Sequence, residues 1–237
     1  MALNGTISGS GALIKTNSNT LTLGGANTYA GGTTVNQGAL VVNGSVGAVT
    51  VNTGGSLGGS GTVGAVTLTS GSFLNPGNSP GLLTAASSSW AAGATYNWEI
   101  NQASGGTAGV NWDVFSVTGA LDLSALSSTA KMNLVLQSLP AMDDFSASSE
   151  YSWVFAQAGS LLGAGLADGT NVTDLFNITA TAFNSGVLPN GGFKVEVGTT
   201  DGLRTLNLMA VPEPSTGAML VLGLVGLVGM RALRRKS

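Results

Sequence analysis

The chain has 237 residues, with 37 glycines, no cysteine and no histidine. Only 8% of its residues are charged, whereas 43% are apolar; ordinary globular domains carry about 25% charge. The missing cysteines exclude disulfides and thiolate metal sites. The missing histidines exclude the usual general base and every Ser-His-acid triad. This composition favours a repetitive β structure with tight turns, and it predicts no enzyme and no catalytic, cofactor-binding or metal-ligating residue.

The first part of the chain repeats itself. Gly47–Leu57 reads GAVTVNTGGSL and Gly64–Leu74 reads GAVTLTSGSFL, an offset of 17 positions between residues 47 and 64. An earlier copy, Thr34–Leu40, aligns with Thr50–Leu57 after one inserted residue. A unit this short cannot bury a core alone, but it can when stacked on its neighbours. The repeat therefore predicts a solenoid of β-strands.

Stacking fixes which side chains become neighbours. Val49–Val51 and Val66–Leu68 are expected to lie side by side in parallel, with Thr50 and Thr67 pointing outward. Asn36 and Asn52 occupy matching positions, and we expect them to form a hydrogen-bonded ladder with a structural role.

A longer segment of this region is similar to a known repeat. Residues 20–44 contain LTLGGANTY, GGTTV and GAL in that order, and residues 74–82 read LNPGNSPGL. Residues 20–82 thereby resemble the autotransporter-associated β-strand repeat. The resemblance implies a right-handed parallel β-helix, used as a surface stalk or passenger, over a first domain of residues 1–89.

Residues 90–210 have a different pattern, with wider polar loops and nearly all of the charge of the body. We predict that they form further β structure that continues or caps the coil; a separate small β-sandwich is the alternative. The strands expected here are Ala94–Ile100, Val114–Val117, Met132–Leu136, Tyr151–Phe155, Phe176–Ala182, Phe193–Val197 and Leu203–Met209.

Few acidic or aromatic residues in this half are candidates for a catalytic or ligand-binding role. Asp143 and Asp144 are adjacent in an expected loop over Pro140–Ser149, which seldom places two carboxylates across a sugar as a glycosidase requires. Asp113 is expected to accept hydrogen bonds at a turn or cap. The tryptophans are expected in the core, although they could stack on sugars; they are Trp90, Trp98, Trp112 and Trp153.

The C-terminal tail contains a segment that resembles a membrane span. Residues 216–230 carry no charge, and a basic cluster follows. We predict one transmembrane helix over about residues 216–233, which is short for a bilayer that needs about 20 apolar residues; a buried core helix is the alternative. The basic cluster predicts a cytoplasmic C-terminus and an exported body. It consists of Arg231, Arg234, Arg235 and Lys236.

The segment VPEPST precedes this span at residues 211–216. Its two prolines cannot continue a regular strand, so they make a stiff, accessible stretch. Residues 211–237 resemble the PEP-CTERM sorting domain in the order of tripeptide, hydrophobic span and basic terminus. The resemblance implies recognition by the inner-membrane enzyme exosortase through Pro212, Glu213 and Pro214, followed by removal of the tail.

Together these patterns predict an exported, non-enzymatic protein of the cell surface or extracellular matrix, serving adhesion, biofilm building or display. The expected partners are exosortase, the inner membrane transiently, and matrix components such as exopolysaccharide. The body lacks the basic face that nucleic acid requires. Two alternatives are a carbohydrate-active β-helix enzyme and a permanently membrane-anchored surface protein. Residues 1–23 contain no signal-peptide pattern, so we expect upstream residues to be missing.

Overall fold

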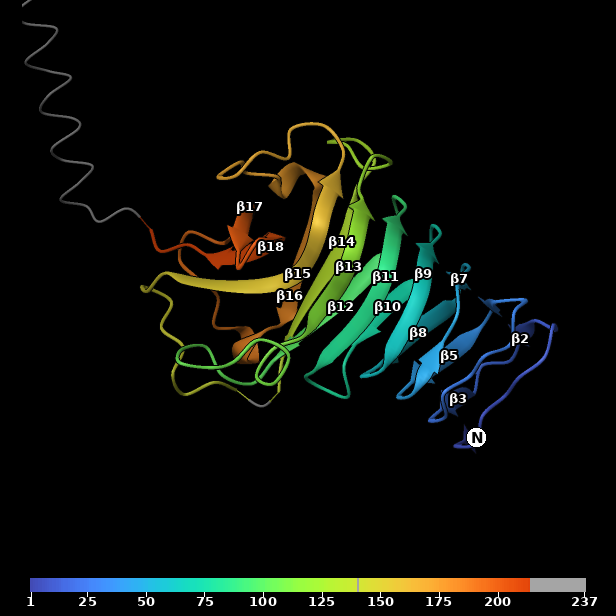
Figure 1. Cartoon of the computed structure of the whole chain (residues 1–237). Coiled ribbons are helices and arrows are strands. Elements are labelled where there is room, and N and C mark those ends of the chain that lie inside the picture. The colour runs from blue at the N-terminus through green and yellow to red at the C-terminus, as the bar shows by residue number, and fades with distance from the viewer. Residues whose placement is uncertain (140, 214–237) are drawn as a thin grey trace, which may run out of the picture.

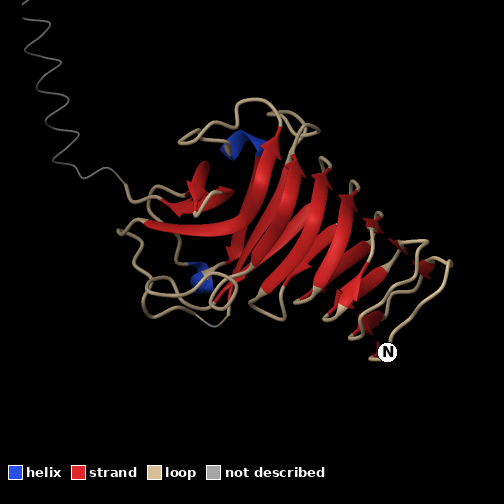
Figure 2. Cartoon of the chain, in the orientation of Figure 1, coloured by secondary structure: helices blue, strands red, loops and turns tan. Residues whose placement is uncertain are grey.

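A computed structural model describes residues 1–139 and 141–213, and almost all of the regular structure is β-strand. Most consecutive strands alternate between two sheets that face each other (Figures 1 and 2). The first sheet contains, in spatial order, β1 (Ala2–Leu3), β3 (Thr20–Leu23), β5 (Gly38–Val42), β8 (Gly55–Gly59), β10 (Phe73–Pro76), β12 (Thr95–Ile100), β14 (Met132–Ser138) and β16 (Phe176–Ala182).

The second sheet is built in the same way from the intervening strands. Its order is β2 (Leu13–Lys15), β4 (Thr33–Val35), β7 (Val49–Val51), β9 (Thr62–Leu68), β11 (Leu82–Trp90), β13 (Val114–Asp122), β15 (Tyr151–Leu162), β18 (Leu203–Ala210) and β17 (Phe193–Thr200), with β6 (Ser45–Val46) paired to β9. All pairings from β1 to β16 are parallel, so each turn of the chain adds one coil to a stack. This arrangement is compatible with the predicted β-helix.

The register confirms the alignment of the repeats. Val49 pairs with Val66 and Thr50 with Thr67 in parallel, and Leu40 pairs with Leu57 across the other sheet. The flanking apolar side chains are buried, whereas Thr50 is half-buried and Thr67 is exposed. The period-2 alternation of a strand therefore points valines into the core and threonines outward, as the sequence predicts.

The second half of the chain extends the same stack. Strands β12, β14 and β16 join the first sheet, and β13 and β15 join the second. The two halves share both sheets, because β10 pairs with β12 and β11 pairs with β13. Strands lengthen along the stack, from 3 residues in β4 to 12 in β15. Longer coils enclose a wider interior, which larger side chains can fill.

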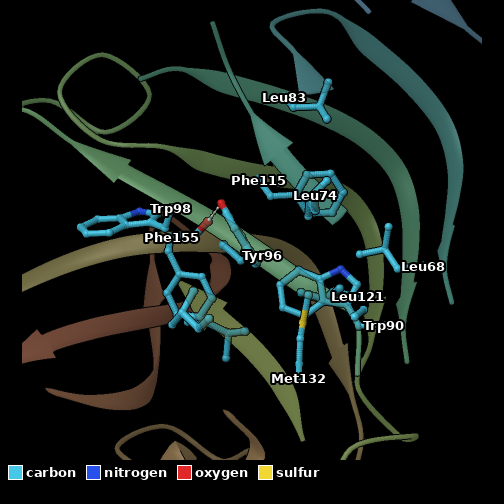
Figure 3. Close-up of a cluster of buried hydrophobic side chains, with 14 of the residues drawn as sticks. Leu68, Leu74, Leu83, Trp90, Tyr96, Trp98, Phe115, Leu121, Met132 and Phe155 are labelled. Carbon is cyan, nitrogen blue, oxygen red and sulfur yellow. Dashed lines mark hydrogen bonds between the residues drawn. The ribbon is translucent and has the colours of Figure 1, made fainter. Parts of the chain in front are cut away.

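Aromatic side chains fill that wider interior (Figure 3). Trp90, Trp98 and Trp153 are at most 1% exposed, which confirms their predicted place in the core, whereas Trp112 is half-buried. The ring of Tyr96 meets that of Phe155 edge to face at 5.6 Å, and its hydroxyl donates to the Phe155 carbonyl at 2.7 Å. The core of the narrow coils, in contrast, consists mainly of Val and Leu.

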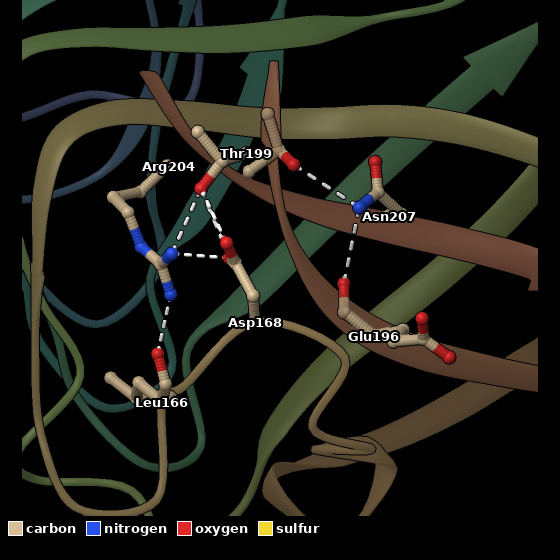
Figure 4. A network of polar contacts seen from close by, with 7 residues as sticks. Leu166, Asp168, Glu196, Thr199, Arg204 and Asn207 are labelled. Carbon is tan, nitrogen blue, oxygen red and sulfur yellow. Dashed lines mark hydrogen bonds and ion pairs between the residues drawn. The ribbon is translucent and has the colours of Figure 1, made fainter. Parts of the chain in front are cut away.

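An antiparallel hairpin closes the C-terminal end of the stack. Strand β18 runs antiparallel to β15 and to β17. The two 3-10 helices, η1 (Thr173–Leu175) and η2 (Asn184–Gly186), flank β16. Arg204 on β18 forms an ion pair with Asp168 and donates hydrogen bonds to the Thr199 hydroxyl at 2.9 Å and to the Leu166 carbonyl at 2.6 Å (Figure 4). This network ties the loop after β15 to the hairpin.

Candidate functional site

The predicted sorting residues lie where the chain leaves the hairpin. The amide of Val211 donates to the Gly192 carbonyl at 2.9 Å, and the amide of Gly191 donates to the Val211 carbonyl at 2.7 Å. Pro212 is half-buried, and Glu213 is exposed. The acidic residue of the predicted tripeptide therefore follows two residues after Val211, whose backbone is hydrogen-bonded to the body. Pro214 and the basic cluster Arg231, Arg234, Arg235 and Lys236 lie outside the described residues.

A glycine lets the chain exit so close to the hairpin turn. A Cβ added at Gly191 would lie 2.7 Å from the Val211 oxygen and 2.8 Å from the Pro212 oxygen. A larger residue there would displace the segment. No helix among residues 1–139 and 141–213 has the length and apolar character needed to cross a membrane. The predicted span over residues 216–233 lies outside the described part of the chain.

The adjacent acids Asp143 and Asp144 lie in a loop, as predicted, and both are exposed. Asp144 accepts hydrogen bonds from the amides of Ala103 at 3.0 Å and Ser104 at 2.7 Å. Burial alone would raise the pKa of Asp144, yet the bonds from Ser104 and Ala103 lower it below its ordinary value. Asp144 thus connects its own loop to the loop that follows β12 through these hydrogen bonds.

A cleft of about 470 Å³ opens beside the first sheet, where β10 turns toward β11. Its floor comes from the outward positions of β10, β12 and β14, and its wall from the turn after β10. The lining residues are Asn75, Pro76, Gly77, Asn78, Ser79, Asn97, Glu99, Asp113 and Gln137. The wall belongs to the LNPGNSPGL segment, in which Gly77 adopts a positive φ of 83° that favours glycine.

Asp113 is 1% exposed and holds the cleft together. Its carboxylate accepts the amide of Gly81 at 2.7 Å and the amide of Glu99 at 3.1 Å. Burial raises the pKa of Asp113 to about 8, and the nearby Glu99 carboxylate adds to the rise, while the two backbone hydrogen bonds oppose it. The prediction that Asp113 is a hydrogen-bond acceptor is confirmed, although the amides belong to other segments rather than to its own turn.

Glu99 is the second acid of the cleft. Its carboxylate accepts the hydroxyl of Ser79, and it neighbours Gln137 across paired strands. Glu99, Asn97 and Gln137 belong to no motif and were not predicted from the sequence as site residues. Their alternation with buried Trp98 and Leu136 along two strands is the signal that places them on an outer face.

The cleft has no evident metal site. No group of three or more Asp, Glu, His or Cys side chains that could hold a metal ion occurs among residues 1–139 and 141–213. Two carboxyls with four primary amides can form hydrogen bonds to a polar ligand, and they carry no group that would pair with an anion.

Family models recognise two segments of the chain. Residues 13–42 match the Passenger-associated-transport-repeat, and residues 210–236 match the PEP-CTERM protein-sorting motif. Both resemblances drawn from the sequence are thereby confirmed; the repeat model ends at residue 42, short of the residue 82 predicted. A search of curated proteins finds no match. The sorting motif implies export, passage through a membrane for sorting, and processing by exosortase.

Proposed function

We propose that this chain is a non-enzymatic surface or extracellular-matrix protein, whose right-handed β-solenoid body serves adhesion, biofilm building or display. In this proposal exosortase recognises Pro212, Glu213 and Pro214, while the basic cluster keeps the C-terminus in the cytoplasm. The tail is then removed, and the body reaches the cell surface or the medium. The observation that carries the proposal is the PEP-CTERM sorting motif at residues 210–236, which begins at Ala210, the last residue of β18.

The hydrogen bonds that the acidic side chains accept support a non-enzymatic body. Asp113 already accepts two backbone amides, and Asp144 accepts two more. Carboxylates committed to backbone groups in this way hold loops in place. No Ser-His or Cys-His pair is available, because the chain has neither histidine nor cysteine.

The test is the intact mass of the protein recovered from surface, medium and inner-membrane fractions of cells that contain exosortase. We expect a surface form that ends near residues 212–215 and is lost in the Glu213→Ala variant. Asp201→Asn is the control, because Asp201 is also an exposed acid but lies in the turn between β17 and β18, at the opposite end of β18 from the motif. A full-length form confined to the inner membrane in the unaltered protein would instead establish the permanently anchored alternative.

A carbohydrate-active enzyme is the second candidate, and the meeting of Glu99 and Asp113 in one cleft is the observation that favours it. A glycosidase needs two carboxyls that face each other across the scissile bond. Release of reducing sugar from a polysaccharide by the purified chain, abolished in Glu99→Gln, would establish this candidate and refute the non-enzymatic one.

A further inference from the structure

The cleft beside β10 is built for a polar ligand of small-molecule size. Its volume of about 470 Å³ lies in the range of about 300–1,000 Å³ that is usual for ligand sites. Seven of its nine lining residues carry a side-chain oxygen, and neither an aromatic ring nor a basic side chain lines it. Such a surface offers nothing to an apolar ligand, and the Glu99 carboxylate repels an anionic one.

A bare cation fits poorly as well. The cleft contains two acids rather than a group of three. Its 470 Å³ is also many times the roughly 30 Å³ that one water molecule occupies in the liquid. A compound with several uncharged hydroxyl groups fits both the size of the cleft and its polar lining. Its hydroxyls can donate to carboxylates and exchange hydrogen bonds with amides.

The amides are arranged in rows across successive coils. Asn97 donates to the Asn75 side chain at 2.6 Å, and Asn75 donates to the Ser56 hydroxyl at 2.6 Å. At the neighbouring corner, Asn78 donates to Asn43 at 3.1 Å and to the Ser60 hydroxyl at 2.8 Å. These bonds fix the orientation of the amides in advance, so that little side-chain freedom remains to be lost on binding.

The rows also give the cleft a direction. Neighbouring strands lie about 4.8 Å apart, so equivalent polar groups recur at that interval along the stack. Each primary amide has two N–H donors and a carbonyl with two lone pairs, and the row contacts use only part of this capacity. A chain of linked rings with hydroxyls at regular intervals matches such a surface.

We propose that this cleft binds an uncharged saccharide along the solenoid axis, with the amides of Asn75, Asn97 and Gln137 bonding its hydroxyls and Glu99 accepting from one of them. This site names a ligand class for the proposed matrix function. The inference rests on that proposed function only for where the binding would occur in the cell. The buried Asp113 carboxyl, whose pKa is raised by burial to about 8, keeps a proton at neutral pH and limits the negative charge of the cleft.

The experiment is isothermal titration of the purified full-length chain, held in a detergent without sugar headgroups. Cellotetraose and maltotetraose are the uncharged probes, and tetragalacturonate is the anionic one. We expect at least one uncharged probe to bind with a Kd of about 1 mM, because no aromatic platform adds stacking energy. Glu99→Gln and Asn97→Ala should each weaken binding roughly tenfold.

Asn177→Ala is the matched control, since Asn177 lies exposed on β16 of the same sheet, outside the cleft. It should leave the titration unchanged, and thermal unfolding verifies that every variant is folded. Absence of binding by both uncharged probes would overturn the proposal, as would equal binding of tetragalacturonate or unaltered binding in the two cleft variants. The purified chain is tested without exosortase, so failure here leaves the sorting proposal standing, and failure of sorting leaves the binding result intact.

Discussion

The side-chain amide of Asn52 donates a hydrogen bond to the side-chain oxygen of Asn36 one coil away, at 2.8 Å. The two residues are 16 positions apart and flank paired strands, since Val35 pairs with Val51. The contact confirms the ladder predicted from matching positions in the repeat. It lies on the outside of the solenoid, where water competes for both groups.

The ladder should therefore contribute less to stability than the core beneath it. We expect Asn52→Ala to lower the free energy of unfolding by less than about 1 kcal/mol. Leu57→Ala removes a side chain that is 0% exposed and should cost about 2–5 kcal/mol through lost burial and the cavity left behind. Urea unfolding of both variants measures the difference. Equal losses would show that the coils depend on the outer ladder as much as on the core.

Asp113 makes stability depend on pH in an unusual direction. Its folded pKa is raised from 3.8 to about 8, mainly by burial, so the folded state holds a proton that the unfolded state releases. The stabilisation is complete below pH 3.8 and is lost as the pH rises toward about 8. Within this window the free energy of unfolding should fall by up to about 1.4 kcal/mol per pH unit.

Asp113→Asn should remove this slope, although it also loses one backbone hydrogen bond and begins from a lower stability. The chain contains no histidine, so above about pH 5.5, where ordinary carboxyls have already titrated, we expect Asp113 to account for the slope. Chemical unfolding at a series of pH values provides the measurement. A slope of the same size in Asp113→Asn would refute the role given to this carboxyl.

The ion pair of Arg204 with Asp168 should stabilise the capping hairpin modestly. The Asp168 side chain is 57% exposed, so a double-mutant cycle of Arg204→Ala and Asp168→Ala should give a coupling of about 0.2–1 kcal/mol. The pair Lys194–Glu196, 3.5 Å apart with both side chains 34% exposed, is the control. We expect a weaker coupling there, because Arg204 is also held by Thr199 and Leu166. A stronger coupling in the control pair would contradict this ranking.

Gly191 should determine how firmly the chain is held where it leaves the body. Gly191→Val places side-chain atoms against the Val211 and Pro212 carbonyls and should release this segment. Hydrogen exchange at the Val211 amide, bonded to Gly192, should accelerate, and limited proteolysis near residues 211–213 should become faster. Gly11→Ala, with nothing within 4 Å of the added Cβ, is the control and should behave like the unaltered chain. Unchanged exchange at Val211 in Gly191→Val would refute the contact.

The sequence was sufficient to predict the narrow coils, because their chemistry repeats. Leu40, Leu57 and Leu74 recur at intervals of 17 positions and are all 0% exposed. Strands in the second half were also predictable from their alternation; β16 has the predicted bounds, Phe176–Ala182.

The cleft could not be predicted in the same way. Asp113 bonds the amide of Gly81, 32 residues earlier, and that of Glu99, 14 residues earlier. The coils here are no longer equal in length: Leu74 pairs with Tyr96, whereas Tyr96 pairs with Leu134. Without a constant interval, the sequence does not reveal which polar residues become neighbours, and a carboxyl such as Asp113 resembles any turn residue.

The antiparallel hairpin also determines how the body would respond to mechanical force. A pull on the chain beyond Val211 enters the fold through Ala210, the last residue of β18, which is paired with Tyr151 on one side and Phe193 on the other. Tension along β18 is resisted at once by its two rows of backbone hydrogen bonds, one with β15 and one with β17, which are loaded in shear. A tether attached at this end would therefore load the longest strand of the solenoid first, and the short coils near residue 1 last.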